Sequence, residues 1–449
     1  MKFFSRLASR RFALLATMVL AIAMVAAACS DDGDDDSSSA TAEATTAAAT
    51  AVAATAAPTT VAPTEVMPNE TLKIGFLADF SGPIAEFGPE IQTGFELAIL
   101  HVNLAGGVLG NDVVFVTGDS ALNATQGVEE ARRLVEIEGV HAIVGPLSST
   151  VTLAVSASVT ADAGIPVISP SATSPALTTA DDNGFLFRST TSDAAQGVVL
   201  ASLAADEGYD NVGVLFINDA YGQGLAEAFE GAFVGAVTSS SFEADAVSYL
   251  AELQSAADGG ATTLVAIAFP TQAEIFIREA LENDLFDSFL FVDGTKSEDL
   301  ITAIGAENLE GFKGTAPGPG PESPALTAWN SAYKFRFGPL PTRPFVREAY
   351  DAVIAIALAA QAAGSVDGTA IRDQLANVGG PGGAEFIPGV DGIAAAFAVL
   401  AAGLEVNFAG AATSLDWNEN GDVTSGYVGI WQYSDGAIVE VTEVPFTLD

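Results

Sequence analysis

The sequence is poor in cysteine, histidine and basic residues. It has one cysteine, two histidines, and 16 Lys and Arg against 57 Asp and Glu. One cysteine excludes an intramolecular disulfide. The formal net charge of −41 makes nucleic acid an unfavourable partner, so no nucleic-acid binding is expected. His101 and His141 fall in an expected helix and an expected strand, and they are too few to support a zinc cluster or a Ser/His/Asp triad.

The motifs of several enzyme classes are also missing. There is no GxxxxGK[ST] phosphate loop and no G-x-S-x-G elbow. "GGPGG" (379–383) lacks a lysine and is typical of a loop. "DWNENG" (416–421) starts like a calcium loop, but its twelfth position is Tyr427 where a Glu is needed, which favours a hairpin turn. We therefore expect a binding protein without catalytic activity, metal or cofactor.

The first 28 residues have the pattern of a signal peptide. A basic start, "MKFFSRLASRR", precedes an apolar run over residues 12–25 and three alanines, and Cys29 follows. This order resembles the lipobox of bacterial lipoproteins, which implies lipidation at Cys29. The pair Arg10-Arg11 also permits twin-arginine export.

Residues 29–70 have the composition of a flexible linker. They are rich in Asp, Ser, Thr, Ala and Pro and contain no aromatic side chain, so they cannot bury enough apolar surface to fold. No later apolar run is long enough to span a bilayer. The sequence thus predicts an extracytoplasmic body tethered to the cell membrane by the lipid on Cys29.

From residue 71 onward, apolar β-rich runs alternate with helix-like segments. Strands are expected at 72–78, 113–117, 140–145, 165–169, 211–217, 262–269 and 288–294. Helices are expected at 90–103, 124–137, 150–164, 193–207, 221–235 and 271–284. Short apolar strands between helices favour parallel sheets covered on both faces, and two such series favour two α/β lobes.

Polar side chains stand where these strands end. They are Ser148, Ser149, Ser171, Thr173, Tyr221 and Asp293. Open parallel sheets bind ligands beyond the carboxyl ends of their strands, so these residues predict a binding cleft. The hydroxyl groups could instead cap the helices that follow, and the sequence leaves both roles open.

Several blocks of sequence resemble one known family. The opening, "LKIGFLADFSGPIAEFGPEIQTGFELAILHVNLAGGVLGNDV", is similar to that of the branched-chain amino-acid-binding proteins of ABC transporters, the type I periplasmic-binding family. Further similar blocks follow in order: "GIPVISPSATSPALT", "FRSTTSDAAQG", "NDAYGQGLAEAF", "LEGFKGTAP", "REAYDAVIAIALAA" and "LDWNENGDV". The resemblance covers about residues 71–440.

The resemblance implies a fold of two Rossmann-like lobes joined by a three-segment hinge. The first lobe would comprise 71–190 plus 317–410 and the second 191–316 plus 411–449, with the ligand between them. The stretch 378–417 resembles an insertion that includes an Ala-rich helix.

The resemblance also implies roles for residues in the cleft. Ser149, Ser171 and Thr173 would hold the carboxylate of an amino acid, a role suited to hydroxyl and N–H groups at helix starts. Asp293 and Tyr221 would hold the ammonium group. The side-chain pocket is assigned separately, to Phe87 and Phe269, although Pro270 competes with Phe269 for its place.

The function implied is that of a solute-binding lipoprotein that delivers an amino acid, of branched-chain or other aliphatic type, to an ABC permease. We expect it to act as a monomer. A receptor for an amide, urea or aromatic acid would use the same fold, as would a ligand sensor. An extracellular hydrolase is disfavoured because no nucleophile with a base can be assembled.

Overall fold

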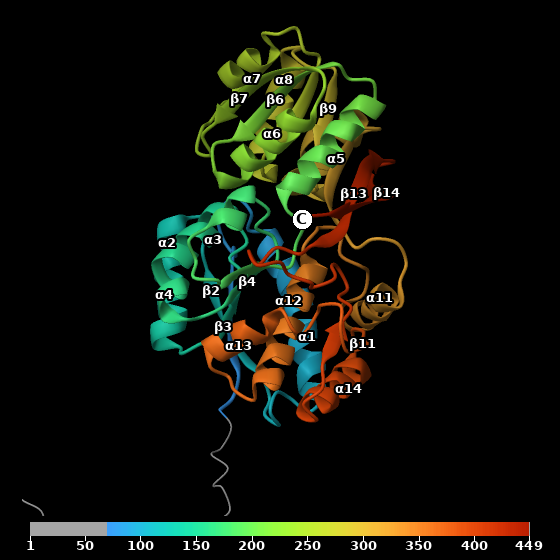
Figure 1. Cartoon of the computed structure of the whole chain (residues 1–449). Helices are drawn as coiled ribbons and strands as arrows, with labels where there is room; N and C mark the ends of the chain where they lie inside the picture. Colours follow the sequence, from blue (N-terminus) through green and yellow to red (C-terminus); the bar gives the residue numbers. More distant parts are fainter. Residues whose placement is uncertain (1–69, 449) are drawn as a thin grey trace, which may run out of the picture. The chain divides into compact units, whose positions relative to one another are not determined.

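The computed structural model describes residues 70–448, which contain two large β-sheets, each flanked by helices (Figure 1), and one small two-stranded sheet. The signal peptide, the lipidation at Cys29 and the linker were predicted for a part of the chain that lies outside the described residues, apart from Glu70.

The first sheet has five parallel strands in the order β2-β1-β3-β4-β5. Its strands are β1 (Lys73–Ala78), β2 (Val114–Asp119), β3 (Ala142–Val144), β4 (Val167–Ser169) and β5 (Leu186–Arg188). Successive side chains of β1 point to opposite faces, so Ile74 and Phe76 enter one apolar core while Leu77 enters another. Both faces of this sheet are therefore buried, as the apolar strands predicted.

Helices cover both faces of the first sheet. On one face α1 (Phe87–Leu104) packs against α12 (Val346–Ala363). On the other, α2 (Ala124–Arg132), which continues as the π-helical η1 (Arg133–Ile137), packs against α3 (Ser149–Val155). The helical stretch that begins with α3 runs on through η2 (Ser156–Thr160) and α4 (Ala161–Ala163).

The second sheet has seven strands in the order β14-β13-β10-β9-β8-β6-β7. They are β6 (Asn211–Ile217), β7 (Ala236–Phe242), β8 (Thr263–Ile267), β9 (Ser288–Phe291), β10 (Lys313–Gly318), β13 (Ser425–Ser434) and β14 (Ala437–Thr447). The parallel type predicted for this sheet holds for β6 to β10, whereas β13 and β14 are antiparallel to each other and β13 is antiparallel to β10. A hairpin turn at Asp435-Gly436, where both residues have positive φ, makes β14 antiparallel to β13.

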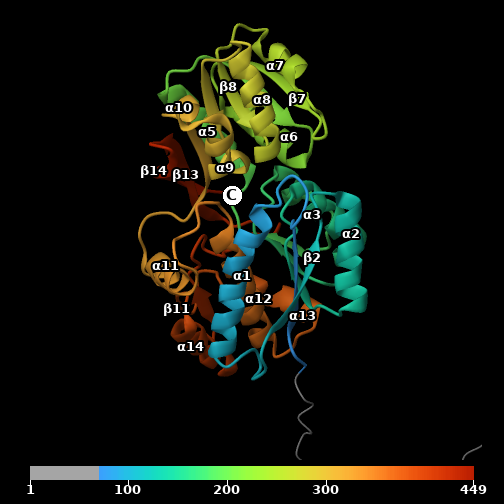
Figure 2. The same ribbon diagram turned by 180° about the vertical axis from the view of Figure 1, so that it is seen from behind.

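Helices flank the second sheet on both faces. The helices are α5 (Asp193–Asp206), α6 (Ala220–Ala232), α7 (Leu250–Ala257), α8 (Pro270–Glu282), α9 (Glu298–Ile304) and α10 (Ala306–Leu309). α5 and α6 pack together on one face, and α8 lies on the other (Figures 1 and 2). Two short 3₁₀ segments complete the picture, η3 (Pro175–Thr179) and η4 (Asp293–Thr295).

The chain passes between the two sheets three times. Residues 189–192 join β5 to α5, and residues 319–323 join β10 to α11 (Pro324–Phe337), which packs against α1. Residues 409–424 join β12 (Val406–Phe408) to β13. The fold is thus a two-lobed α/β architecture with a three-segment connection, and the residue boundaries given above for each lobe stay predictions.

The stretch 378–417 packs on the first lobe. It contains the short parallel pair β11 (Ala384–Phe386) and β12, and between them α14 (Val390–Ala401), which confirms the Ala-rich helix. α14 contacts both α12 and α1. It follows α13 (Gly368–Leu375) and an irregular loop over 379–383. Within residues 70–448 no single helix is long and apolar enough to cross a membrane; α12 and α13 satisfy that test only as a pair, with a bend of 106° between them.

Candidate ligand-binding site

The strand order reverses at one place in each sheet. In the first sheet β1 lies between β2 and β3, and in the second β6 lies between β7 and β8. Crossover connections on either side of such a point leave a crevice at the carboxyl ends of the strands. The loops that follow these strands hold the residues predicted to bind the ligand.

Six of the seven predicted ligand residues line one cavity. They are Phe87, Ser149, Ser171, Tyr221, Phe269 and Asp293. The remaining wall consists of Ile84, Ile91, Leu147, Ser148, Gly294 and Phe345. The cavity has a volume of about 30 Å³, room for about two water molecules, so an amino acid requires its walls to move apart. Thr173 is not part of the wall.

Ser148 and Ser174 act as helix caps, which is the alternative role that the sequence left open for the hydroxyl groups. Ser148 caps α3 by accepting from the N–H of Val151, at 3.5 Å. Ser174 caps η3 by accepting from the N–H of Ala176, at 3.3 Å. Ser149 Oγ accepts from the N–H of Ser174 at 3.2 Å. A hydroxyl that accepts in this way keeps its own hydrogen for another acceptor, so Ser149 is suited to donate to a ligand anion.

Ser171 and Thr173 differ from Ser149 in how they are used. Ser171 donates its hydroxyl hydrogen to the carbonyl oxygen of Leu147 at 2.9 Å, which ties two ligand-facing loops together. The hydroxyl of Thr173 is buried and has no hydrogen-bond partner in the described part of the chain. The Thr173 carbonyl accepts from the N–H of Asp193 at 2.8 Å.

The opposite wall of the cavity carries a buried carboxylate. Asp293 is 3% exposed, and its Oδ1 accepts from Gln196 Nε2 at 2.7 Å and from the Tyr221 hydroxyl at 3.0 Å. Burial raises the pKa of Asp293 to about 6, and the two hydrogen bonds act in the opposite direction. A cationic group brought to this carboxylate would favour its charged form.

Tyr221 is fixed in place by its neighbours. Its ring stacks on Phe269 with centroids 5.4 Å apart, and its oxygen accepts from the N–H of Gly294 at 3.3 Å. A Cβ at position 294 would lie 2.5 Å from the carbonyl oxygen of Ala268 and 2.9 Å from the Tyr221 oxygen. Only glycine therefore allows this close approach of the strand end to the tyrosine.

The structure adds three residues that the sequence did not single out for this site. Asp193 and Gln196, from the first turn of α5, are fully buried beside Asp293. Burial, and then the charge of Asp293, raise the pKa of Asp193 well above its usual range. Thr173 approaches this carboxylate, but no hydrogen bond of ordinary geometry joins them. The only sequence signal was an acid directly after the hydroxyl-rich run "STTS".

The third added residue is Phe345, which forms part of the cavity wall just before α12. Its φ of 78° lies in the left-handed region, which a bulky aromatic residue rarely adopts. Nothing in the surrounding "PLPTRPF" predicts that conformation.

Larger hollows lie elsewhere among the described residues. One of about 490 Å³ borders the loop 379–383, and one of about 520 Å³ lies beside Tyr427 and Phe446. Neither is lined by buried charged groups that face one another. A third, of about 190 Å³, also borders Phe345 and is lined by Lys296 and Arg347 among others. The smaller cavity is the candidate ligand site, because hydroxyl groups and a buried carboxylate meet there from two sheets.

Comparison with known proteins agrees with this geometry. The model of a periplasmic binding protein family matches residues 71–387, more than half of the chain. A two-lobed α/β fold with a polar site at the facing strand ends defines this class of binding protein. The chain belongs to the periplasmic binding protein family.

Individual proteins of known name are similar to this chain in sequence and in fold. "Leu/Ile/Val-binding protein homolog 3" of Brucella melitensis is 28% identical over 376 residues, which cover 82% of this chain and 93% of that protein. The fold resembles that of the leucine-binding protein LivK of Thermotoga maritima, with a TM-score of 0.70, 23% identity, and coverage of 83% and 99%. It also resembles LivJ of Streptococcus pneumoniae, solved with isoleucine, with a TM-score of 0.68, 24% identity, and coverage of 84% and 100%.

Proposed function

We propose that this protein is the solute-binding component of an ABC importer and that it captures an amino acid with an aliphatic side chain between its lobes. The observation that carries the proposal is the meeting of two opposite polar groups in one cavity. Ser149 offers a hydroxyl donor from the first lobe, and Asp293 offers a carboxylate from the second. A zwitterion has a partner for each.

The position of Ser149 supports a carboxylate partner. It is the first residue of α3, and the helical stretch that follows extends to Ala163. The start of a helix has unpaired N–H groups and the positive end of the helix dipole, and both favour an anion. The carboxylate of the amino acid would therefore lie against the first lobe.

Asp293, with Tyr221 beside it, is the partner proposed for the ammonium group of the ligand. Asp293 is held by Tyr221 and Gln196, so it is oriented before any ligand arrives. Between the two polar ends the wall is apolar, made of Ile84, Ile91, Leu147 and phenylalanine rings. Such a wall favours an aliphatic side chain over a charged one. The names of the relatives, Leu/Ile/Val-binding proteins, agree with that choice.

Binding by this route requires motion and no catalysis. The walls leave about 30 Å³ between them, so the lobes would open about their three connecting segments to admit the ligand and close over it. The difference in ligand affinity between the open and closed states would then drive closure. The role proposed is delivery to a permease rather than enzymatic turnover.

A thermal-shift screen tests the ligand. The protein is heated in the presence of amino acids, amides, urea and aromatic acids, and the true ligand raises the melting temperature by mass action. We expect leucine, isoleucine or valine to raise it, and we expect Asp293→Ala to abolish the rise while leaving the ligand-free protein folded. A rise with an amide or an aromatic acid alone would support the second candidate function, a receptor for those compounds.

We also propose that the mature protein is a monomer anchored outside the cytoplasm by lipid on Cys29. The lipid anchor is supported by the order of a basic start, an apolar run, small residues and a cysteine. Fractionation of cells that express the Cys29→Ser variant tests it. The unaltered protein should stay with the membranes and label with palmitate, and the variant should do neither. Equal membrane retention of both would contradict the anchor.

A further inference from the structure

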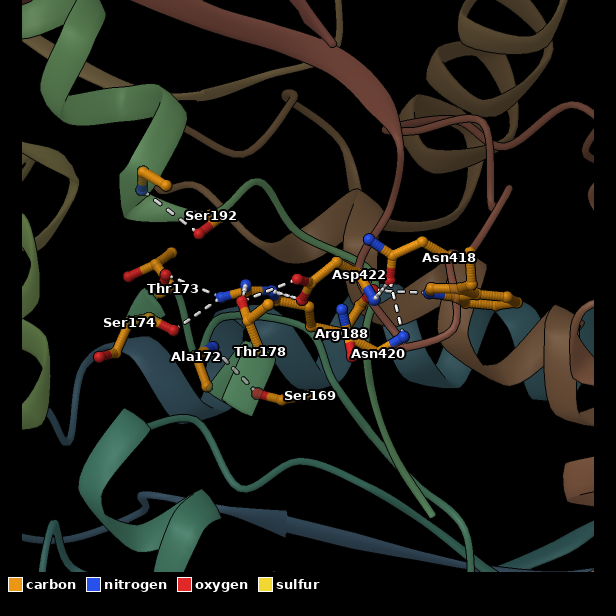
Figure 3. Close-up of polar contacts among 12 residues, drawn as sticks. Ser169, Ala172, Thr173, Ser174, Thr178, Arg188, Ser192, Asn418, Asn420 and Asp422 are labelled. Atoms are coloured by element: carbon orange, nitrogen blue, oxygen red, sulfur yellow. Dashed lines mark hydrogen bonds and ion pairs between the residues drawn. The ribbon is translucent and has the colours of Figure 1, made fainter. Parts of the chain in front are cut away.

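Arg188 stands at the centre of a buried hydrogen-bond network outside the cavity (Figure 3). It is the last residue of β5 and is 1% exposed. Its Nε donates to Asp422 Oδ1 at 2.6 Å, and its Nη2 donates to the hydroxyl of Thr178 at 2.9 Å. Thr178 in turn donates to Asp422 Oδ2 at 2.8 Å. Both carboxylate oxygens of Asp422 are therefore occupied, and the guanidinium plane is fixed.

The third nitrogen of Arg188 holds the loop that faces the ligand. Nη1 donates to the carbonyl oxygens of Thr173 at 2.8 Å and Ser174 at 2.9 Å. This loop follows β4 and includes Ser171, which lines the cavity. Figure 3 shows the guanidinium group between these two carbonyls and the side chain of Asp422.

The hydrogen bond from Arg188 to the Thr173 carbonyl helps to orient the hydroxyl group of Ser149, which lines the cavity. The Thr173 carbonyl and the Ser174 N–H belong to the same planar trans peptide, so they point in opposite directions. Arg188 binds the carbonyl side, and the N–H on the other side donates to Ser149 Oγ at 3.2 Å. The orientation of the Ser149 hydroxyl is thereby connected to the guanidinium group through a single peptide.

Asp422 belongs to the third connection between the lobes, residues 409–424. The main chains of this connection and of β5 lie side by side, because the N–H of Arg188 donates to the carbonyl of Gly421 at 3.0 Å. Trp417 Nε1 also donates to the carbonyl of Arg188 at 2.8 Å. The anchor of the network is therefore part of the segment about which the lobes would move.

The loop after β4, which Arg188 holds by its Thr173 and Ser174 carbonyls, also contacts the second lobe. Ser174 Oγ donates to the carbonyl of Ala220, the first residue of α6, at 2.7 Å. The N–H of Ala220 donates to Thr150 Oγ1 at 3.1 Å. The loop that Arg188 fixes is thus one of the surfaces on which the two lobes meet.

We infer that Arg188 is a positioning residue for ligand binding. Anchored by Asp422 in the third connection, it orients the 173–174 peptide and so aims the Ser149 hydroxyl at the ligand carboxylate. The inference rests on the proposed function, and it extends that function from the residues that touch the ligand to a buried ion pair that does not.

The first test is a double-mutant cycle on affinity. Lys in place of Arg188 keeps the charge but loses the planar fork that reaches carbonyl and carboxylate together. We expect Arg188→Lys to raise the Kd for leucine about tenfold when Ser149 is present and less than about twofold in the Ser149→Ala background. An equal factor in both backgrounds would show that Arg188 does not act through Ser149.

The second test needs no ligand. Hydrogen exchange at the Ser174 amide reports the bond to Ser149 Oγ directly. It should be faster in Arg188→Lys, and faster to a smaller degree in Thr178→Val, which removes one partner of the guanidinium group. An unchanged Ser174 rate in both variants would overturn the inference, whichever compound the protein binds. If Arg188→Lys does not fold, Thr178→Val carries both tests.

Asp351→Asn is the matched control. Asp351 is equally buried and accepts from the N–H groups of Ala411 at 2.9 Å and Ala412 at 2.8 Å, in the same third connection. It makes no hydrogen bond to the loop over 170–178 in the described structure. We expect lower stability, with Ser174 exchange and leucine affinity changed less than about twofold. A loss of affinity equal to that of Arg188→Lys would mean that any weakening of this connection suffices.

Discussion

The hydroxyl of Tyr221 donates to Oδ1 of Asp293 across 3.0 Å, and both side chains are almost completely buried. Tyr221 comes shortly after β6 and Asp293 shortly after β9. Only β8 lies between these two strands in the sheet, and because all three are parallel their carboxyl ends meet at the same edge. A carboxylate held in this way is costly to bury unless a cation compensates it. The ammonium group of the proposed amino-acid ligand would be that cation.

Removing the charge of Asp293 should weaken binding strongly. Asp293→Asn keeps the shape and one acceptor, yet it loses the charge-assisted bond to the ligand, so we expect the Kd for leucine to rise about a hundredfold or more. Tyr221→Phe, which removes only a supporting hydroxyl, should raise it about tenfold. Isothermal titration calorimetry measures both. Wild-type affinity in Asp293→Asn would show that the ammonium group binds elsewhere.

Binding should also depend on pH through Asp293. Burial raises the pKa of this carboxyl to about 6, so the free protein carries a proton there at lower pH. A protonated carboxyl cannot pair with an ammonium group, so affinity for leucine should fall as the pH decreases below about 6 and level off above about 7. Asp293→Asn should show no such step. Stronger binding at pH 5 than at pH 7 would contradict the assignment.

Ser149 should contribute to affinity without contributing a helix cap. Ser149→Ala should raise the Kd for leucine by about tenfold and leave α3 capped, since Ser148 caps the helix. Its stability should fall by about 1 kcal/mol, because the Ser174 N–H loses its acceptor. Asp367→Ala is the control: Asp367 caps α13 by accepting from the N–H of Ala370 at 3.0 Å. That variant should lose about 1 kcal/mol of stability and keep its affinity. An unchanged Kd in Ser149→Ala would mean that Ser149 has only a structural role.

Phe345 has a left-handed backbone conformation and its side chain forms part of the cavity wall. Because its φ is 78°, glycine should fit this position better than alanine. Phe345→Gly should therefore be more stable than Phe345→Ala by about 1 kcal/mol, although both lose the same aromatic wall and should bind leucine equally weakly. Urea denaturation compares the two. A less stable Gly variant would show that the left-handed conformation is not kept without the ring.

The buried acid Glu348 should make stability depend on pH. Its burial raises its pKa to about 7 from an ordinary value of 4.5. The folded state then binds more protons than the unfolded state between these values, so this group makes the protein less stable as the pH rises through that range. Glu348→Gln should melt at a higher temperature than the wild type at pH 8, with a smaller difference at pH 4. The exposed control Glu227→Gln should show no such gain.

Much of the fold followed from local apolar patterns, and the exceptions have physical causes. The β6 run "NVGVLFI" was predicted at its full length because both faces of that strand are buried. The edge strand β7, "AVTSSSF", was missed because an exposed edge needs few apolar residues. Strands β13 and β14 were not assigned, and their antiparallel pairing follows from a turn rather than from periodicity.

The site could be predicted where it depends on strand ends and not where it depends on packing between distant segments. Tyr221 and Asp293 directly follow or lie near the ends of strands, which the sequence marks. Asp193 enters the site because the first connection turns it toward Asp293, and Arg188 meets Asp422 across 234 residues. "DWNENGDV" had the expected form of a turn, closed by the Trp417–Val423 bridge, yet the contact of its Asp422 with Arg188 was visible only in the structure.

We propose that one cavity binds both ends of a zwitterion. Calorimetry with leucine and its two truncated analogues tests it most directly: isocaproate lacks the ammonium group, and isoamylamine lacks the carboxylate. We expect leucine to bind and each analogue to bind about a hundredfold more weakly or worse, because each leaves one buried polar group unpaired. Binding of isocaproate as tight as that of leucine would contradict it.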